Sequence, residues 1–147
     1  MDHIVYLDVN AKELDNLISG RKTMIIRGAM GRKMPHGRIE PNDTLYFIQN
    51  NGSGVVVAKA YAQAVFCSGQ LTKDESRELV DSFADKLMLN TDLRRRFRGK
   101  RYLTLITLSD FKTIEPFSIT RVGFTNMDDW LPVGNIESVR IDKPFIP

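Results

Sequence analysis

Residues 19–27 read Ser-Gly-Arg-Lys-Thr-Met-Ile-Ile-Arg, and this stretch decides how the chain is interpreted. A helix-like segment stops at Gly20, two cations follow, and a short apolar strand then ends in a third cation. Because the strand is too apolar to lie in water, we expect it to be buried, with Lys22 and Arg27 projecting from its ends. Cations held at the ends of a rigid strand can bind a negatively charged or polar ligand at a fixed distance.

The composition is that of an ordinary globular protein. The chain has 147 residues, of which 42% are hydrophobic and 27% charged, so we expect a single domain over residues 1–147. Cys67 is the one cysteine, which excludes an internal disulfide, and its apolar surroundings favour a buried, inert thiol. No segment approaches the roughly 18 apolar residues that cross a bilayer, and the first residues do not resemble a signal peptide. We therefore expect a cytoplasmic protein with no membrane partner.

Hydrophobic periodicity predicts a small sheet with a few helices. Asn-Asn-Gly-Ser-Gly at 50–54 is a hairpin turn, so the strands around it should be antiparallel. Small alanines alternate with larger residues in the second of these strands, which is typical of a strand bent around a tight barrel. The less regular stretch 109–135 holds short strand pieces at 111–114 and 119–124. The expected strands are 3–9, 22–27, 43–49, 55–67, 101–108 and 136–141, and the expected helices are 11–19, 73–88 and 90–98.

Helix ends and connections refine this picture. We expect Asn10 to cap the first helix and Gly20 to end it in a left-handed conformation. Thr72 followed by Glu75 is a capping-box pattern before the next helix. The first helix is too short for a full crossover, so the strand that follows it should lie across the barrel from the first strand. The predicted fold class is α+β, mainly β: a small mixed or antiparallel pseudo-barrel of five to six strands flanked by two or three helices.

The positive charge is concentrated in one segment. Residues 93–101 read Leu-Arg-Arg-Arg-Phe-Arg-Gly-Lys-Arg and hold six cations without an acid. Subtracting these six from the net charge of +3 leaves −3 for the rest of the chain. A local run of arginines interrupted by Phe97 suits phosphates and a stacked base, although such a run is also typical of a solvated helix face.

Other candidates have structural alternatives. The loop 31–38 adds cations that could line the same groove as Lys22 or lie in solvent. His3 and His36 are far apart and lack neighbouring metal ligands, so we expect no metal and no cofactor. Trp130 is expected to cap the core rather than stack on a base.

At this point the chain resembles the ASCH family of the PUA-like superfamily. The family pattern Gly-x-Lys-x-x-Glu-x-Arg follows a short helix and enters a strand, and Gly20, Lys22 and Arg27 match it in register. A basic loop, a turn at Asn42-Asp43 and a strand then follow in the family order, with Asn able to replace Gly where φ is positive. The resemblance spans roughly residues 4–108 and implies a PUA-like fold.

One position departs from the pattern. Ile25 occupies the acidic position of the pattern. In the family branch that hydrolyses acetylated cytidine, the corresponding residue resembles a threonine that acts together with the motif lysine and a glutamate on the later helix. By resemblance the lysine is Lys22 and the glutamate is Glu78 or Glu75. Thr23 lies on the same face of a regular strand as residue 25. Its hydroxyl could replace the missing threonine hydroxyl if the ligand bound lower in the site, nearer to residue 23.

We therefore expect a domain that binds RNA or a nucleotide-like ligand in a basic cleft beside strand 22–27. Buried Lys22 could alternatively act as a base with Glu78 in a hydrolase of modified nucleosides or small amides. Arg27 could be purely structural, paired with Asp43 or Glu40. A protein-interaction module with an acidic partner is the third class. The expected ligand-binding residues are Gly20, Arg21, Lys22, Thr23, Arg27, Arg94, Arg95, Arg98, Lys100 and Arg101.

Overall fold

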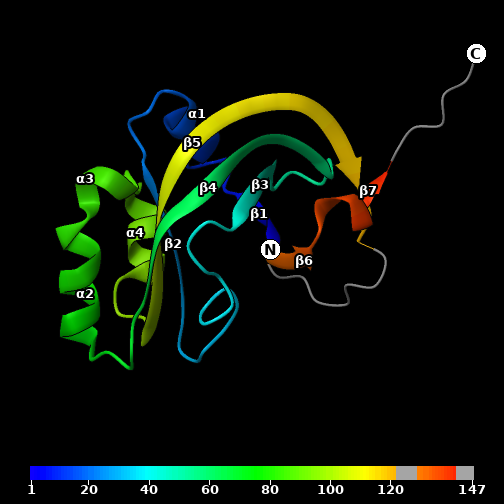
Figure 1. Cartoon of the computed structure of the whole chain (residues 1–147). Helices are drawn as coiled ribbons and strands as arrows, with labels where there is room; N and C mark the ends of the chain where they lie inside the picture. Colours follow the sequence, from blue (N-terminus) through cyan, green and yellow to red (C-terminus); the bar gives the residue numbers. More distant parts are fainter. Residues whose placement is uncertain (122–128, 142–147) are drawn as a thin grey trace, which may run out of the picture.

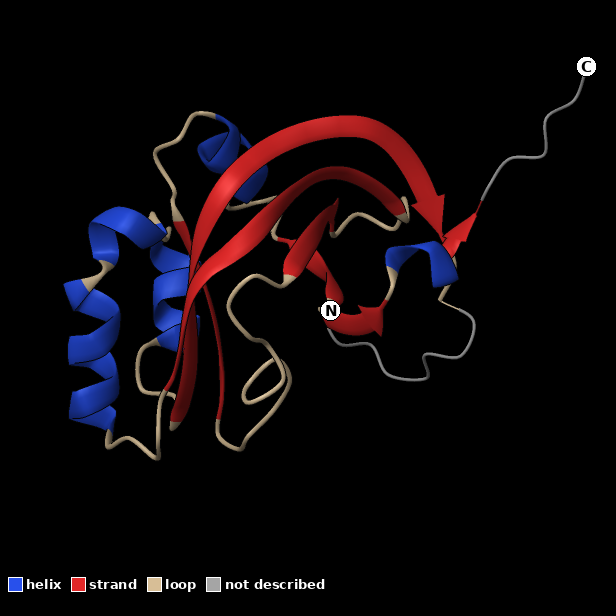
Figure 2. Ribbon diagram, in the orientation of Figure 1, coloured by secondary structure: helices blue, strands red, loops and turns tan. Residues whose placement is uncertain are grey.

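The computed structural model describes residues 1–121 and 129–141. It is a mainly β structure in which a curled half-barrel sheet carries helices α2, α3 and α4 on one flank (Figures 1 and 2). The strands are β1 (Asp2–Leu7), β2 (Met24–Ala29), β3 (Thr44–Gln49), β4 (Val55–Cys67), β5 (Tyr102–Ile119), β6 (Trp130–Gly134) and β7 (Arg140–Ile141). The helices are α1 (Glu13–Ile18), α2 (Lys73–Ser82), α3 (Ala84–Leu87) and α4 (Thr91–Phe97), with a 3-10 turn at Ile136–Ser138. The predicted α+β, mainly β pseudo-barrel is confirmed, although the described residues form seven strands and four helices where five to six strands and two or three helices were expected.

The two longest strands give the sheet its curvature. β4 and β5 pair antiparallel over most of their length and arch across the molecule (Figure 1). Their register shifts at three places, and such bulges bend a strand and increase its twist. Ala58, Ala60 and Ala62 are buried on the concave side, where larger side chains would not fit against the core. The small residues predicted to bend this strand therefore lie where it bends.

The order of the strands separates β1 from β2. The sheet runs β2-β5-β4-β3-β1-β6, and β7 pairs with β5. β1 is parallel to β3, while β2 is an edge strand antiparallel to β5. The expected placement of the second strand across the barrel is confirmed. The space between the two is filled by a core that includes Val5, Leu17, Ile25, Phe47 and Trp130.

Several local predictions hold. Thr72 Oγ1 accepts from the Glu75 backbone N–H at 3.1 Å, and the Glu75 carboxylate accepts from the Thr72 N–H at 2.9 Å, which completes the capping box. Gly20 and Asn42 have φ values of +77° and +74°, as their turns require. Trp130 is a core residue at 1% exposure.

Other local predictions were wrong, for identifiable reasons. Asn10 does not cap α1, because Asp8 Oδ1 accepts from the Ala11 N–H and the helix starts at Glu13. The strand expected to end at residue 108 continues to Ile119, because β4 supplies a partner along its whole length. Such a long-range partner has no local signature in the sequence.

The remaining differences concern α2 and the C-terminal third. The helix expected over 73–88 is divided at Phe83 into α2 and α3. The strand β6 was missed, and the segment expected as a strand at 136–141 is a 3-10 turn followed by the two residues of β7. The piece expected at 119–124 lies partly outside the described residues. In the described ranges, the helices are too short and too polar for any to cross a membrane.

Candidate functional site

Arg27 lies inside the molecule and is held by several groups. Its side chain comes from β2 and is only 7% exposed. Nη1 donates to the Ile26 carbonyl at 2.7 Å, and Nη2 donates to the Tyr6 carbonyl at 2.8 Å. Nε lies 3.2 Å from Asp129 Oδ2, close enough for an ion pair but too poorly aligned for a hydrogen bond. The guanidinium is therefore fixed in one orientation by β1, β2 and the start of β6.

The expected pairing of Arg27 with Asp43 or Glu40 is wrong. Asp43 instead accepts from the ring of His3 at 2.8 Å and pairs with the N-terminal amine at 3.2 Å. Trp130 Nε1 donates to His3 Nδ1 at 3.0 Å, which leaves the proton on His3 Nε2, facing the carboxylate. Burial lowers the pKa of His3 despite the opposing effect of Asp43. These hydrogen bonds connect the N-terminus to β6. Asp43 is therefore occupied, and the carboxylate that pairs with Arg27 is that of Asp129.

Lys22 is also buried, at 3% exposure, and it precedes β2 as expected. Arg27 was expected at the end of this strand but lies inside it, because β2 continues to Ala29. Its Nζ donates to the Leu87 carbonyl at the end of α3, and its backbone N–H donates to Asn16. Burial lowers the pKa of Lys22 from 10.5 to about 8, because the ammonium loses its hydration. The negative charge of Glu13 opposes this effect, and the positive charge of Arg27 reinforces it.

Glu13 is a buried carboxylate that the sequence did not single out. It is the first residue of α1 and is 4% exposed. Among the residues that the structure describes, Oε2 has no hydrogen-bond partner. An acid in the first turn of a helix is common, because it complements the helix dipole, so nothing in the local pattern distinguished this one.

Glu13 and Arg27 line one polar cleft, here called the Arg27 cleft. Its inner chamber has a volume of about 70 Å³, and its outer chamber has a volume of about 300 Å³. Both chambers are lined by Arg27, Asn50, Arg96, Phe97 and Asp129. Tyr6, Asp8, Glu13 and Leu93 complete the inner chamber, and Gly28, Lys33 and Met34 complete the outer one.

The two chambers differ in charge. Three carboxylates and two arginines line the inner chamber, whereas Arg27, Arg96 and Lys33 outnumber Asp129 in the outer one. The loop that was expected to contribute cations therefore does so through Lys33, while the ring of His36 is bonded to the Ser68 carbonyl at 2.6 Å. Acidic side chains therefore predominate in the smaller chamber and basic ones in the larger chamber.

The arginine helix α4 divides its charges between two directions. Leu93 and Phe97 face the core, and Arg96 faces the Arg27 cleft. Arg94 and Arg98 instead bind Asp81 of α2, with nitrogen–oxygen distances of 2.9 and 3.0 Å.

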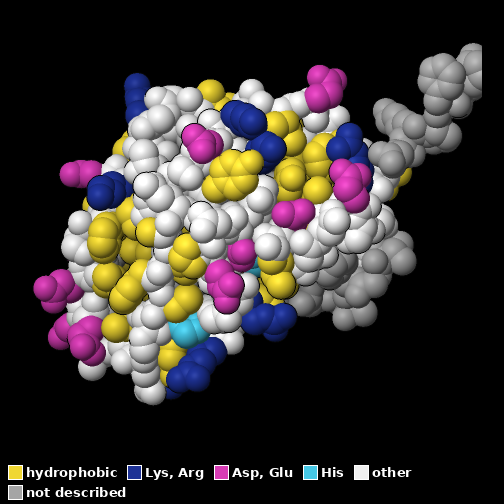
Figure 3. All heavy atoms as spheres, in the orientation of Figure 1, with side chains coloured by type: hydrophobic (Ala, Val, Ile, Leu, Met, Phe, Trp, Pro, Cys, Tyr) yellow, Lys and Arg dark blue, Asp and Glu magenta, His cyan; other side chains and the backbone are white. Residues whose placement is uncertain are grey.

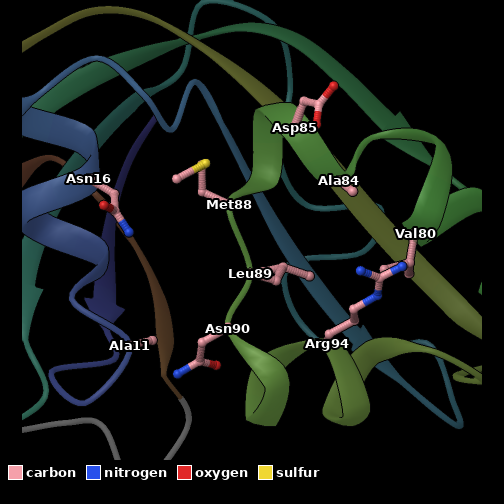
Figure 4. A pocket seen from close by; sticks show the side chains of 9 residues that line it. All are labelled: Ala11, Asn16, Val80, Ala84, Asp85, Met88, Leu89, Asn90 and Arg94. Atoms are coloured by element: carbon pink, nitrogen blue, oxygen red, sulfur yellow. The ribbon is translucent and has the colours of Figure 1, made fainter.

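Arg94 also borders a second cavity of about 260 Å³ (Figure 4). Asn16 and Ala11 line it on one side, and the segment Met88–Leu89–Asn90 between α3 and α4 lines it on another. We expected the whole arginine run to converge on one cleft, but the arginines of α4 point in two directions. The one that lines the cleft together with Arg27 is Arg96, which was not among the predicted site residues.

The other predicted residues lie around this arrangement. Arg21, Thr23 and Arg101 are exposed, Lys100 is half-buried, and Gly20 shapes the turn before Lys22. Arg95 is 76% exposed and lies 4.0 Å from Asp92. Their roles stay predictions.

The two glutamates considered as partners for Lys22 are both exposed. Glu75 is engaged in the capping box, and Glu78 lies on the exposed side of α2. The carboxylate that acts electrostatically on Lys22 is Glu13. The pairing of Lys22 with Glu78 in catalysis stays a prediction.

Acidic and basic side chains are interspersed on the face drawn in Figure 3. Within the described residues, no cluster of His, Cys, Asp and Glu could hold a metal ion. Cys67 is half-buried, and its Sγ lies 3.5 Å from the Gly37 nitrogen.

Comparisons with known proteins identify the fold. No protein-family model matches the sequence, and no curated protein matches it. A crystal structure of ASCH from Zymomonas mobilis is similar at 20% identity with a TM-score of 0.57, covering 78% of this chain and 71% of that one. Two single-substitution variants of the Zymomonas protein superpose with TM-scores of 0.65 and 0.64 at 16% and 17% identity, each over 93% of this chain and 93% and 91% of theirs.

The chain therefore has an ASCH-like fold. The resemblance first indicated by Gly20, Lys22 and Arg27 is confirmed at the level of the fold.

Proposed function

We propose that this protein binds RNA or a nucleotide-like ligand in the Arg27 cleft and acts in the cytoplasm. The observation that supports the proposal is that Arg27 and Arg96, from a strand and a helix far apart in the sequence, line the same polar cleft. Lys33 adds a third cation at the outer chamber. Phosphate oxygens are the natural ligands of such a set, because the arginine fork and the ammonium both donate to them.

Arg96 is the arginine best suited to contact a phosphate. Arg94, Arg95 and Arg98 each lie within 4.0 Å of a carboxylate of their own helix or of α2. Within the described residues, Arg96 has no such ion pair, and it is exposed. A cation without a competing carboxylate loses less when it binds an external anion, so Arg96 should contribute more to RNA affinity than its neighbours.

A matched pair of variants tests this. Arg96→Ala and Arg95→Ala remove the same charge from adjacent positions of α4, but only residue 96 lines the cleft. Binding of a fluorescently labelled single-stranded RNA would be measured by anisotropy between 50 and 300 mM salt. We expect Arg96→Ala to weaken binding roughly tenfold and to reduce the log–log salt slope by about 0.7, the value of one phosphate contact. Arg95→Ala should change neither by much.

Three outcomes would contradict the proposal. Equal losses in the two variants would mean that the cleft has no special role and that only net charge matters. Absence of RNA binding, or affinity independent of salt, would end the proposal altogether. Displacement of RNA by heparin as readily as by unlabelled RNA would point to a site for acidic partners in general.

Hydrolysis of a modified nucleoside or another small amide is a second candidate, supported by one observation. Burial lowers the pKa of Lys22 to about 8 even though the charge of Glu13 opposes the shift, so a neutral amine is accessible near physiological pH. However, Lys22 lines neither chamber and donates to the Leu87 carbonyl. Catalysis would require that contact to open.

A panel of acetylated cytidines incubated with the wild type and Lys22→Ala tests the hydrolase. Turnover that is lost in the variant would support a catalytic lysine, and equal turnover would clear Lys22 of any role. Glu13→Gln and Glu78→Gln then distinguish the carboxylate next to the lysine from the one expected by resemblance.

A further inference from the structure

The inner chamber of the Arg27 cleft is rich in hydrogen-bond acceptors, and their present partners differ. Asp8 Oδ1 accepts from the Ala11 N–H at 2.8 Å. Asp129 Oδ2 lies 3.2 Å from Arg27 Nε. Glu13 Oε2, in contrast, is buried and has no hydrogen-bond partner among the described residues.

An unpartnered buried carboxylate oxygen is unusual in a folded protein. Buried polar groups are nearly always hydrogen-bonded, and a charged group without a partner loses its hydration without compensation. Glu13 is 4% exposed and is one of the residues that line the chamber, so its carboxylate lies at the wall of the space that a ligand would enter. A donor placed there by a ligand would satisfy it.

We propose that Glu13 reads the ligand, by accepting a hydrogen bond from an exocyclic amino group of its base. This inference rests on the proposed function, and it adds a preference for amino-bearing nucleotides. The phosphate would lie in the outer chamber, with Arg96 and Lys33, and the amino edge of the base would point inward.

The size and charge of the inner chamber determine this direction. At about 70 Å³ it admits the edge of a base rather than a whole nucleotide, and its three carboxylates outnumber its two arginines, which disfavours a phosphate there. A keto oxygen in the place of the amino group would bring two acceptors together and leave both without a donor. A site that is built to bind an N–H therefore discriminates strongly against an analogue that lacks it.

The first test needs only the unmodified protein. Its affinity would be measured for four RNA pentamers that are uridine at every position except the centre, which is guanosine, inosine, cytidine or uridine. Inosine is guanosine without the amino group, and uridine carries a keto oxygen where cytidine carries an amino group. We expect guanosine to bind roughly 10-fold or more tightly than inosine, or cytidine to bind more tightly than uridine by a similar factor.

The second test assigns the preference to one carboxylate. Glu13→Gln keeps the size of the side chain but removes its charge, so the preference should fall by most of that factor. Asp15→Asn makes the same chemical change at an exposed position of the same helix and should leave the preference intact.

The possible results separate the two proposals. Salt-dependent RNA binding that depends on Arg96 but shows no preference in either pair would overturn the role of Glu13 and leave the proposed function standing. A preference that survives Glu13→Gln would also overturn it. No binding of any pentamer would remove both proposals together.

Discussion

The cations around β2 and the cations on α4 differ in their burial and in the partners that they bind. Lys22 and Arg27 are 3% and 7% exposed and donate to backbone carbonyls inside the molecule. Arg94, Arg95 and Arg98 lie at the surface, and each pairs with a nearby carboxylate. The two buried cations are each held in place by fixed partners, whereas the exposed arginines are more numerous but form ion pairs that are individually weak.

This contrast shows that the density of charge in a sequence is a poor guide to a site. Exposed ion pairs contribute about 0–1 kcal/mol because water and salt screen them. A buried charge costs several kcal/mol to desolvate and must be held by fixed partners. The basic run attracted attention in the sequence, yet much of it neutralises Asp81 and Asp92. The residue that the fold fixes in the wall of the cleft is Arg27, and the fold also places Arg96 in that wall.

The largest effect is expected from Arg27→Ala. The substitution removes the guanidinium donors of the Ile26 and Tyr6 carbonyls and leaves Asp129 without its cation. We expect the free energy of unfolding in urea to fall by about 3–5 kcal/mol, because two hydrogen bonds from a buried charged donor, each worth about 1.5–3 kcal/mol, are lost. Arg95→Ala, at an exposed site, should change it by less than about 0.5 kcal/mol. Equal stability of the two variants would break the comparison between the buried and exposed cations.

The next effect concerns the pH dependence that Lys22 confers. Its pKa is 10.5 in the unfolded chain and about 8 in the folded protein, so the unfolded chain binds more protons between these values. The contribution of Lys22 to stability should therefore rise from pH 8 to 10.5, by about 3 kcal/mol in total at about 1.4 kcal/mol per pH unit. Below pH 8 the full cost of the buried charge is present.

Lys22→Met isolates this contribution, because other lysines and tyrosines titrate alike in both proteins. Urea unfolding at pH 7.5 and 10.5 should show the wild type gaining about 3 kcal/mol relative to the variant. A constant difference across this range would show that Lys22 is as well hydrated in the folded protein as in the unfolded chain.

A smaller effect tests a buried neutral contact next to the arginine helix. Ser76 of α2 is completely buried, and its Oγ accepts from the Gly99 N–H just after α4 at 3.0 Å. Ser76→Ala leaves that N–H unsatisfied, so we expect a loss of about 1–3 kcal/mol in the free energy of unfolding. Ser82→Ala removes an exposed hydroxyl of the same helix and serves as the control. If the two variants are equally stable, burial does not set the strength of these contacts.

The smallest effect is expected at the exposed arginine pairs. Hydrogen bonding to Arg98, with a further contribution from Arg94, lowers the pKa of Asp81. Because the site is partly solvated, Asp81→Asn should cost less than about 1 kcal/mol, and 1 M salt should abolish the difference. Asp74→Asn, at a 96% exposed carboxylate near Arg77, should have almost no effect. If Asp81→Asn lowered the free energy of unfolding by several kcal/mol, the Asp81 ion pairs would behave like the contacts of the buried cations Lys22 and Arg27.

The sequence was informative wherever a structure depends on neighbouring residues. The capping box at Thr72 and the left-handed turn at Gly20 were predicted because each depends on contacts within a few positions. The extent of β4 was predicted because the alternation of small and larger residues marks it in the sequence. The extension of β5 and the existence of β6 were not, since both depend on strands that lie far away in the chain. Asn10 failed as a cap because Asp8 competed for the same turn.

The candidate site was predicted in part. Arg27 could be selected because a cation that follows a buried apolar run must find an acceptor, but its partners could not be named. Those partners come from β1, β2 and the start of β6, which the sheet brings together. Glu13 and Arg96 had no distinguishing pattern, since one is an ordinary first-turn acid and the other is one arginine among several.

By itself the sequence determined most of the strands and helices, and it determined that a cation follows a buried apolar run, because apolar periodicity and turn chemistry act over a few residues. Which charges share a cleft was decided only by the tertiary structure. The curvature of β4 and β5 and the separation of β1 from β2 place Glu13, Arg27 and Arg96 around one space. The burial that shifts the pKa of Lys22 and leaves Glu13 without a partner is a property of that arrangement and not of either residue alone.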